Sequence, residues 1–514
     1  MGQSNDKPQK FYSFQKKEEP KKDQPPTDLK TKVRITITLD NIDSSEYQYK
    51  AFEINDRGET LLCESEKMRG KDSLTFQNFF IMEYYFERQQ KLKILILKNS
   101  ESIQFDTSLG NIIGNQNNTL KKKLKENYKE NIIIQSIELK KQEGKEEYIK
   151  MSFEIDKDKI NEFKKSKKQF YYEVFNNSLL YRSELITSSG VFLPNIIPIS
   201  ILLDEFSFNL YDSKKKQIAS FKSHPNTFVT SDEFKSLSFQ IGSTQITLVN
   251  KSHYDQPPTF IDYLHSGLEF NLIIGIDFTG SNGTPKDSRS LHSLVLGKPN
   301  DYENAILACG NILAEYDSDQ LFPVYGFGAK GNMKGDSMMC FHLNNQRSAK
   351  IHTIQGILDA YRKNVPKLYF SGPTYFAPIV KKCISKIKED NDSTQYYILL
   401  MLTDGAICDM QDTIDQLVKG SILPLSVIIV GIGNANFKNM DILDADDDPL
   451  KSREGVQAAR DLVQFVPFNK YKDDPKKLAE EVLMEVPTQV LEYYEMNNIL
   501  PETITQQKKN KGSK

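Results

Sequence analysis

Several features are missing from this 514-residue sequence, and each absence excludes a class of protein. No apolar run approaches the ~18 residues of a membrane-spanning helix, and the opening MGQSNDKPQKF lacks the apolar stretch of a secretory signal. The five cysteines are scattered and form no CxxC pair, which argues against zinc-finger and RING domains and against a disulfide framework. We therefore expect an intracellular protein with reduced thiols.

A strong net charge and catalytic spacings are also missing. The net charge is −2, so the chain as a whole has no field that would attract nucleic acid, and we expect no nucleic-acid partner. The six histidines show no HExxH or other ligand spacing, and no GxxxxGKS/T phosphate loop occurs. We expect no enzymatic activity.

The sequence begins with a polar tail. Residues 1–29 are rich in Lys, Gln, Pro and Asp, and they are predicted to be disordered because they cannot bury enough apolar surface to fold. Gly2 follows the first methionine, as in a myristoylation signal, but Asp6 stands where that signal requires a hydroxyl residue. An acylated Gly2 would have nearby lysines as the second, basic signal of a stable anchor. An ordinary tail is the alternative.

Short strands at regular spacing predict two antiparallel β-sandwiches. The run KVRITITLDNI alternates apolar and polar residues, as a half-buried strand does. We assign residues 30–130 to the first sandwich, with TLKKKLKENYKE at 119–130 breaking the strand pattern. Residues 131–257, which open with NIIIQSIEL, form the second predicted sandwich.

From residue 258 to 505 the pattern changes to apolar strands separated by helices. The strands read FNLIIGID, LFPVYGFG, YYILLMLTDG and LPLSVIIVGIG, with helix-like segments such as ENAILACGNILAEY between them. This alternation is typical of a doubly wound α/β domain with a mainly parallel, buried sheet. The last residues, 506–514, form a basic tail, QQKKNKGSK.

The loop GIDFTGSNG, residues 275–283, lies where such sheets bind ligands, at the carboxyl end of a strand. A phosphate loop would need a lysine that this segment lacks. A nucleophilic Ser281 would need a GxSxG context and a base, and only an unsupported geometry would bring His292 to that role. The GxGxxG at 326–331 follows a strand, but no amphipathic helix follows it, so a tight turn explains those glycines better.

A divalent-cation site fits the same loop better. Asp277, Thr279 and Ser281 alternate along it, so a turn can aim their oxygens at one point, and hydroxyl ligands leave a bound ion electrophilic. Two later loops add oxygens near the same sheet edge, with Thr374 in SGPTYFAP and Asp404 in LLMLTDG. The alternative is that these five residues only cap helices and form turns.

The pattern DxTxS followed by Thr and Asp resembles the metal-ion-dependent adhesion site of von Willebrand factor A domains. Longer segments across residues 260–500 are more similar still to the copine family, among them FIDYLHSGLEFNLIIGIDFTGSNG, GPTYFAPIV and LPLSVIIVGIGNANF. The resemblance implies two C2 domains before a von Willebrand factor A-type domain, with Mg²⁺ or Mn²⁺ at the five residues above. It also implies a partner protein whose carboxylate completes the metal site.

Copines are known for calcium-dependent phospholipid binding, and their C2 domains hold Ca²⁺ with aspartates in an SDPF-like loop and a YDxDxD-like loop. The first sandwich departs from this pattern. Its opening loop, DNIDSSEYQYKAF, keeps Asp40 and Asp43 but has no SDP, and its later loop has Lys98, Asn99 and Ser100 where aspartates are expected. Because each lost carboxylate weakens a calcium site, we expect weakened Ca²⁺ binding here, with Asp40 and Asp43 still able to lie near an ion.

The second sandwich has lysines in both corresponding loops, and Asp212 survives in LYDSKKKQ as a residual calcium-loop residue. Lysines repel Ca²⁺ and can attract anionic headgroups directly, by about 1 kcal/mol each near an anionic membrane. The basic tract 121–125 would add to this attraction. Solvated loops on purely scaffolding domains are the alternative. The candidate lipid-binding residues are Lys164, Lys165, Lys167, Lys168, Lys214, Lys215 and Lys216.

We therefore predict a copine-like adaptor in the cytoplasm, bound peripherally to the plasma membrane or another intracellular membrane. It would bind anionic phospholipid with weakened or no calcium dependence. Its α/β domain would recruit a cytosolic partner protein through a carboxylate at the Mg²⁺ or Mn²⁺ site. The alternative is a structural component of a complex that uses degenerate C2 domains for protein contacts.

Overall fold

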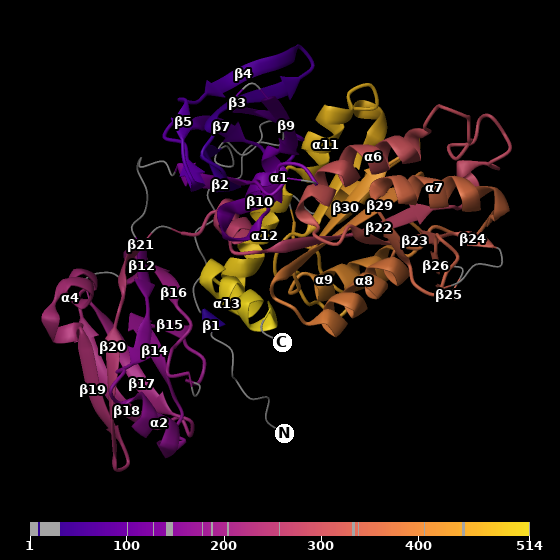
Figure 1. Cartoon of the computed structure of the whole chain (residues 1–514). Helices are drawn as coiled ribbons and strands as arrows, with labels where there is room; N and C mark the ends of the chain where they lie inside the picture. Colours follow the sequence, from indigo (N-terminus) through magenta and orange to yellow (C-terminus); the bar gives the residue numbers. More distant parts are fainter. Residues whose placement is uncertain are drawn as a thin grey trace. The chain divides into compact units, whose positions relative to one another are not determined.

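The computed structural model describes residues 9–10, 31–99, 101–126, 128–139, 148–176, 178–186, 189–202, 205–255, 257–330, 335–337, 339–405, 407–444 and 448–512. The chain forms two units (Figure 1). One contains the second sandwich and residues 494–506, and the other contains the first sandwich, the α/β domain and residues 507–514. Gly2 and most of the predicted disordered tail lie outside the described residues, whereas residues 9–10 form the short strand β1 (Gln9–Lys10).

The first sandwich consists of two antiparallel sheets. Its strands are β2 (Thr31–Ile42), β3 (Glu46–Asn55), β4 (Gly58–Glu64), β5 (Met68–Arg69), β6 (Asp72–Thr75), β7 (Phe80–Tyr84), β8 (Lys91–Lys98), β9 (Glu101–Ser108), β10 (Thr119–Lys123) and β11 (Asn131–Leu139), with helix α1 (Leu109–Ile113) after β9. One sheet follows the order β10-β11-β2-β6 with β7 paired to β2, and the other follows β4-β3-β8-β9 with β5 paired to β3. Alternate residues of β2 are buried, as KVRITITLDNI predicts.

The border between the sandwiches differs from the one predicted at residue 130. β11 pairs with both β2 and β10, so NIIIQSIEL closes the first sandwich instead of opening the second, which extends the first sandwich to Leu139. The tract 119–130, interpreted from sequence as a break, supplies β10 and the connection to β11. An alternating strand fits either sandwich by its pattern alone, and only its hydrogen-bonded partners decide the assignment.

The second sandwich is also antiparallel. Its strands are β12 (Tyr148–Met151), β13 (Phe153–Ile155), β14 (Phe170–Asn176), β15 (Ser178–Arg182), β16 (Asn195–Pro198), β17 (Phe206–Asp212), β18 (Gln217–Ser223), β19 (Ser236–Ile241), β20 (Thr244–Asn250) and β21 (His253–Asp255), with helices α2 (Ile160–Ser166), α3 (Ile199–Leu202) and α4 (Pro225–Thr230). The largest of its sheets has the order β1-β15-β14-β17-β18. Aromatic rings fill the core; Phe153, for example, lies 4.7 Å from Phe208 and 5.1 Å from Tyr172 between ring centroids.

Residues 494–506 belong to the unit of the second sandwich, although the sequence assigned 494–505 to the α/β domain and 506 to the basic tail. Asn498 donates through Nδ2 to the hydroxyl of Tyr181 at 3.2 Å. Leu500 packs in a small buried cluster with Tyr148 and Ile196. Helical periodicity shows that such a segment has an apolar face, but it does not show which domain covers that face.

The α/β domain has a mixed, mainly parallel sheet in the order β25-β26-β23-β22-β29-β30-β31, with β27 paired to β23. Its strands are β22 (Glu269–Asp277), β23 (Leu321–Phe327), β25 (Gly335–Ser337), β26 (Cys340–His342), β27 (Lys350–His352), β29 (Gln395–Thr403), β30 (Leu425–Gly431) and β31 (Val463–Pro467). The strands from β23 to β31 along this order are parallel, and β25, β26 and β27 are antiparallel additions at one edge.

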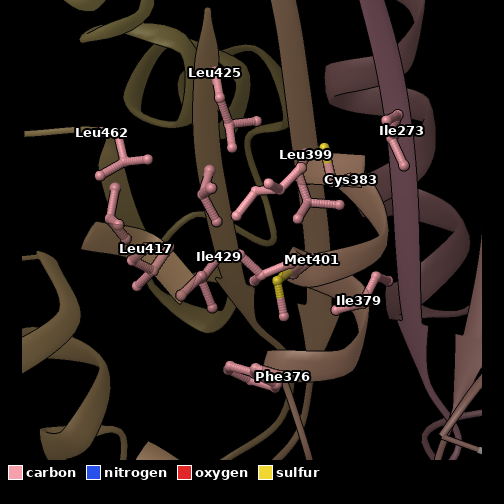
Figure 2. Packing of buried hydrophobic residues seen from close by; sticks show 14 of the residues in the cluster. Ile273, Phe376, Ile379, Cys383, Leu399, Met401, Leu417, Leu425, Ile429 and Leu462 are labelled. Carbon is pink, nitrogen blue, oxygen red and sulfur yellow. The ribbon is translucent and has the colours of Figure 1, made fainter. Parts of the chain in front are cut away.

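Helices cover both faces of this sheet. They are α5 (Phe260–His265), α6 (Asp301–Leu313), α7 (Ile354–Asn364), α8 (Ala377–Asp390), α9 (Met410–Gly420), α10 (Lys438–Asp444), α11 (Pro475–Leu483) and α12 (Val486–Met496). Figure 1 shows α6 and α7 on one face and α8 and α9 on the other. Figure 2 shows the core between the sheet and α8, where Leu399 and Met401 of β29 meet Ile379. The order of two sandwiches followed by a doubly wound domain agrees with the predicted fold class.

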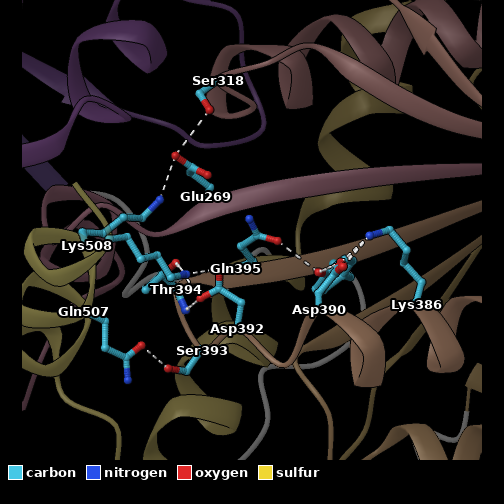
Figure 3. A network of polar contacts seen from close by, with 12 residues as sticks. Glu269, Ser318, Lys386, Asp390, Asp392, Ser393, Thr394, Gln395, Gln507 and Lys508 are labelled. Carbon is cyan, nitrogen blue, oxygen red and sulfur yellow. Dashed lines mark hydrogen bonds and ion pairs between the residues drawn. The ribbon is translucent and has the colours of Figure 1, made fainter. Parts of the chain in front are cut away.

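The residues predicted as a basic tail are helical as far as Gly512, as part of α13 (Pro501–Gly512). Lys508 Nζ lies 2.8 Å from Glu269 Oε1 at the start of β22, and Ser393 donates to Gln507 at 2.5 Å (Figure 3). These contacts join residues 507–512 to the α/β domain. Among all described residues, no helix has both the length and the apolar character of a membrane span.

Candidate metal site and lysine-bearing loops

Asp277 is the last residue of β22, and its side chain is fully buried. Its Oδ1 accepts a hydrogen bond from the backbone N–H of Thr279 at 2.8 Å. Its Oδ2 accepts from the hydroxyl of Thr403 at 2.6 Å. Because β22 and β29 are parallel neighbours, their carboxyl ends meet at one edge, and the residue before Asp404 thereby fixes the orientation of the Asp277 carboxylate.

The other predicted metal-site residues gather at the same edge. The Thr279 and Ser281 hydroxyl oxygens lie 3.0 Å apart, and Ser281 donates to Asp404 Oδ1 at 2.9 Å. Thr374 Oγ1 lies 3.5 Å from Thr279 Oγ1. The structure therefore brings together oxygens from three loops, although Thr374 lies 95 residues after Thr279 and Asp404 lies 123 residues after Ser281.

Two further residues position these loops, and neither was predicted from the sequence. Thr403 orients Asp277, as described above. Asp409 accepts from the backbone N–H groups of Phe376 and Ala377, both at 2.9 Å, and so holds the start of α8 beside Thr374. Phe376 is itself buried in the core (Figure 2). Asp409 follows Asp404 closely in the sequence, so a second acidic residue behind the TDG segment was the available signal.

Burial raises the pKa of Asp277. Burial, and then the negative charge of Asp277, raises the pKa of Asp404 to about 6. Two buried carboxylates that disfavour each other's charge are stabilised in the ionised form by a nearby cation. In the described residues, no group of three or more His, Cys, Asp or Glu is placed to hold a metal. A cation here would therefore depend on the three hydroxyls, and such an all-oxygen set fits a hard ion such as Mg²⁺ or Mn²⁺.

His292 contacts the backbone of the loop at Asp277 and is not a base for Ser281. Its Nε2 lies 2.8 Å from the backbone oxygen of Asp277, and its Nδ1 lies 2.6 Å from the Tyr361 hydroxyl. A carbonyl oxygen can only accept, so Nε2 carries the proton and Nδ1 accepts from Tyr361. Burial lowers the pKa of His292 to about 3, which keeps the ring neutral. With both nitrogens bonded, His292 positions Asp277.

The glycines of the GxGxxG segment allow a close approach to this site. Gly328 has φ +78°, and a Cβ atom there would lie 2.3 Å from Thr279 Cγ2. A larger residue would push the metal loop away from the end of β23. Gly331 lies outside the described residues.

The second sandwich brings its two lysine-bearing segments to one end. Phe170 at the start of β14 pairs with Asp212 at the end of β17, and Ser213 donates its N–H to the backbone oxygen of Gln169 at 3.2 Å. All seven predicted lipid-binding lysines are exposed. In the part of the chain that the structure describes, none of these seven has an acidic partner; the ion pair in this region joins Lys159 to Glu162.

Asp212 has a structural role in the same region. Its Oδ1 accepts from the backbone N–H groups of Lys214 and Lys216, both at 2.9 Å, and so closes the turn between β17 and β18. The first group of lysines lies partly in α2, where a loop was expected from the sequence. The lysines of the first sandwich differ from these, because Lys121 lies 2.6 Å from Asp40 and Lys125 lies 3.7 Å from Glu101.

Comparison with known proteins identifies the family. A family model described as Copine matches residues 290–502. Copine-D of Dictyostelium discoideum is 33% identical over 483 residues, which cover 85% of this chain and 89% of Copine-D. Copine-E of the same organism is 36% identical over 477 residues, which cover 86% of this chain and 81% of Copine-E. The chain belongs to the copine family.

Solved structures show weaker likenesses to this copine. The manganese-loaded TRAP protein of Plasmodium vivax is 14% identical, covers 40% of this chain and 70% of its own, and gives a TM-score of 0.27. The calcium-bound pair of C2 domains from extended-synaptotagmin 2 is 11% identical, covers 45% of this chain and 100% of its own, and gives a TM-score of 0.18. At such scores neither carries an argument. The predicted family is confirmed by the curated relatives.

Proposed function

We propose that this copine is a peripheral membrane adaptor. Its second sandwich binds anionic phospholipid without calcium, and its α/β domain binds Mg²⁺ or Mn²⁺ at Asp277, Thr279, Ser281, Thr374 and Asp404. The metal supplies an electrophilic position for a carboxylate of a cytosolic partner protein. The single observation that supports the adaptor role best is the convergence of these five oxygen-bearing side chains at one sheet edge.

The metal part of the proposal is supported by the balance of charge at the site. Two carboxylates balance the two positive charges of the ion, and the hydroxyls add no further negative charge. The ion therefore stays electrophilic and can bind an additional carboxylate from a partner. Thr403, Asp409 and His292 hold the donors in place before any ion binds, which lowers the ordering cost of binding.

Manganese binding to the full-length chain tests this part. We expect calorimetric titration with Mn²⁺ to give one saturable site that Mg²⁺ competes for. The variants Asp277→Ala and Thr374→Ala should each weaken Mn²⁺ at least tenfold. Thr394→Ala is a matched control. Thr394 is equally buried, but it directly precedes the first residue of β29, at the end of the strand away from the metal site. Unchanged Mn²⁺ affinity in both site variants would refute the metal assignment.

The membrane part is supported by the state of the lysines. Seven exposed lysines converge at one end of the second sandwich without acidic partners among the described residues, and the surviving Asp212 is engaged in a turn. An ammonium group that no carboxylate neutralises retains its attraction for an anionic surface. Calcium, by contrast, would meet lysines in these two segments instead of the several carboxylates that it needs.

Vesicle sedimentation of the full-length chain tests this second part. We expect binding to phosphatidylcholine vesicles that contain phosphatidylserine, and not to pure phosphatidylcholine, with equal binding in calcium and in chelator. Binding that disappears in chelator would contradict calcium independence. Absence of binding in both conditions would favour the scaffold alternative, in which the sandwiches contact only proteins.

A further inference from the structure

Three connections meet at one end of the first sandwich, and we call this end the β2–β3 loop end. Tyr47 pairs with Lys98 across β3 and β8, which places the β2–β3 turn beside the β8–β9 turn. Asn131 at the start of β11 pairs with both Lys123 and Asp40, which brings the β10–β11 connection to the same end. Segments from three regions of the sequence therefore surround one point.

Lys98 occupies that point. Its Nζ lies 2.8 Å from Asp43 Oδ2 in the β2–β3 turn and 2.8 Å from Glu130 Oε1 in the β10–β11 connection. The Lys98 side chain is 17% exposed and that of Glu130 is 12% exposed. One ammonium group thus links two carboxylates from two different connections; its pair with Glu130 is mostly buried, whereas the Asp43 side chain is 57% exposed.

Neighbouring groups complete this arrangement. The Tyr47 hydroxyl donates to Asp43 Oδ1 at 2.9 Å, and the Tyr47 ring lies 5.7 Å below the Lys98 ammonium. Asn99, at φ +51°, donates its backbone N–H to the backbone oxygen of Glu46 at the start of β3 and accepts from the Glu46 N–H through Oδ1. An open pocket of about 500 Å³ lies beside the cluster, and Asp43, Tyr128 and Glu130 line it.

We propose that Lys98 is a built-in cation that holds the β2–β3 loop end together and keeps Ca²⁺ out of it. The ammonium already pairs with both Asp43 and Glu130 and offsets one of their two negative charges. Calcium needs six to eight oxygen ligands and would have to displace a charged side chain attached to the same fold. The first sandwich is therefore permanently in a cation-loaded arrangement. This inference is independent of the proposed function, because Lys98 is neither in the metal site nor among the seven lysines.

The inference makes a gain-of-function prediction. Lys98→Met removes the charge while keeping most of the apolar stem, and leaves Asp43 and Glu130 facing each other beside the open pocket. We expect this variant to unfold several degrees earlier in chelator and to recover part of that loss in millimolar Ca²⁺. Both measurements use the Asp277→Ala background, and with Lys98 intact the unfolding temperature should be the same in calcium and in chelator.

Terbium luminescence gives a second, local readout. The chain has no tryptophan, so a bound Tb³⁺ ion is sensitised by nearby tyrosines, here Tyr47 and Tyr128. The measurement uses full-length protein that carries Asp277→Ala, with and without Lys98→Met, to suppress binding in the α/β domain. We expect at least tenfold stronger Tb³⁺ emission from the protein with Lys98→Met, and excess Ca²⁺ should quench it.

Lys93→Met is the matched control. Lys93 lies on the same strand, is 14% exposed and pairs with a single carboxylate, Glu59, away from the loop end. Its replacement should lower stability without creating a calcium response. A calcium-dependent rise in the unfolding temperature of the protein that carries Asp277→Ala alone, or equal Tb³⁺ emission with and without Lys98→Met, would overturn the proposal. The Asp277→Ala arm can overturn it even if Lys98→Met folds poorly.

Discussion

The two sandwiches carry lysines at equivalent ends and use them in opposite ways. In the first, Lys98 is shielded between Asp43 and Glu130, and Lys121 pairs with Asp40. In the second, the seven lysines are exposed and no acidic group neutralises them within the described residues. The number of lysines in a loop therefore says little about its role. What matters is whether carboxylates from other loops reach the ammonium groups.

Neutralising the exposed lysines should have the largest effect on this comparison. Each lysine contributes about 1 kcal/mol near an anionic membrane, so removing four should weaken vesicle binding by about three orders of magnitude. Sedimentation with phosphatidylserine vesicles measures the change. The combined variant carries Lys164→Gln, Lys165→Gln, Lys214→Gln and Lys216→Gln.

The matched control neutralises four lysines in the first sandwich, two of which are already paired with carboxylates. We expect it to weaken binding by about thirtyfold or less, because only the two unpaired lysines contribute about 1 kcal/mol each and paired ammonium groups contribute little to the surface potential. Equal losses in both variants would show that pairing does not distinguish the sandwiches. The control carries Lys121→Gln, Lys122→Gln, Lys123→Gln and Lys125→Gln.

A higher salt concentration should also distinguish the two lysine environments, with a smaller effect on vesicle binding than the four-lysine variant has. The Debye length falls from about 10 Å at 0.1 M to about 3 Å at 1 M, so vesicle binding through exposed lysines should weaken about tenfold or more. The ion pair of Lys98 with Glu130 is mostly out of solvent and is screened less. Hydrogen exchange of the β8 amides should therefore change little between the two salt concentrations. Salt-resistant vesicle binding would point to apolar insertion instead.

The fold class could be predicted because its signals are local. Alternation along β2 and the apolar runs of β22 and β29 follow from which faces are buried. The domain borders could not be predicted in the same way. Whether β11 closes one sandwich or opens the next depends on hydrogen bonds to strands far away in sequence, and the assignment of residues 494–506 depends on which domain covers their apolar side.

The candidate metal residues could be named because they lie in loops beside strand ends or a helix start and match the DxTxS…Thr…Asp pattern. The residues that position them could not, since their roles depend on distant contacts. In the sequence Thr403 is an ordinary strand residue, and its role follows only from the pairing of β22 with β29. His292 is likewise an isolated histidine in the sequence, and its role follows only from its contact with the backbone oxygen of Asp277. The role of Lys98 was hidden for the same reason, because Asp43 and Glu130 lie 55 and 32 residues away in sequence.

The smallest expected effect is an opposite pH dependence of the two sandwiches. The hydrogen bond from Lys98 holds the pKa of Asp43 well below its usual range, so the first sandwich loses this stabilisation as the pH falls below about 4. In the second, burial raises the pKa of Glu184 to about 7 from an ordinary 4.5. The folded state therefore binds this proton more tightly than the unfolded chain, and stability falls as the pH rises from about 4.5 to 7.

The substitution Glu184→Gln should remove the pH dependence of the second sandwich's stability. Glu184 accepts from the backbone N–H of Leu193 at 2.6 Å through Oε1, and its buried Oε2 has no hydrogen-bond partner in the structure. Ionising a Glu184 whose pKa is raised from 4.5 to about 7 costs about 3 kcal/mol, and an unpaired amide N–H at the Oε2 position of the glutamine offsets about 2 kcal/mol of this gain. We expect a net stabilisation of about 1 kcal/mol at pH 8 and little change at pH 4.

Hydrogen exchange localises the effect, because β14 should become better protected at pH 8 while β3 of the first sandwich stays unchanged. If the variant destabilises β14 at pH 8, Glu184 is held ionised by contacts stronger than its burial, and the contrast in pH dependence disappears.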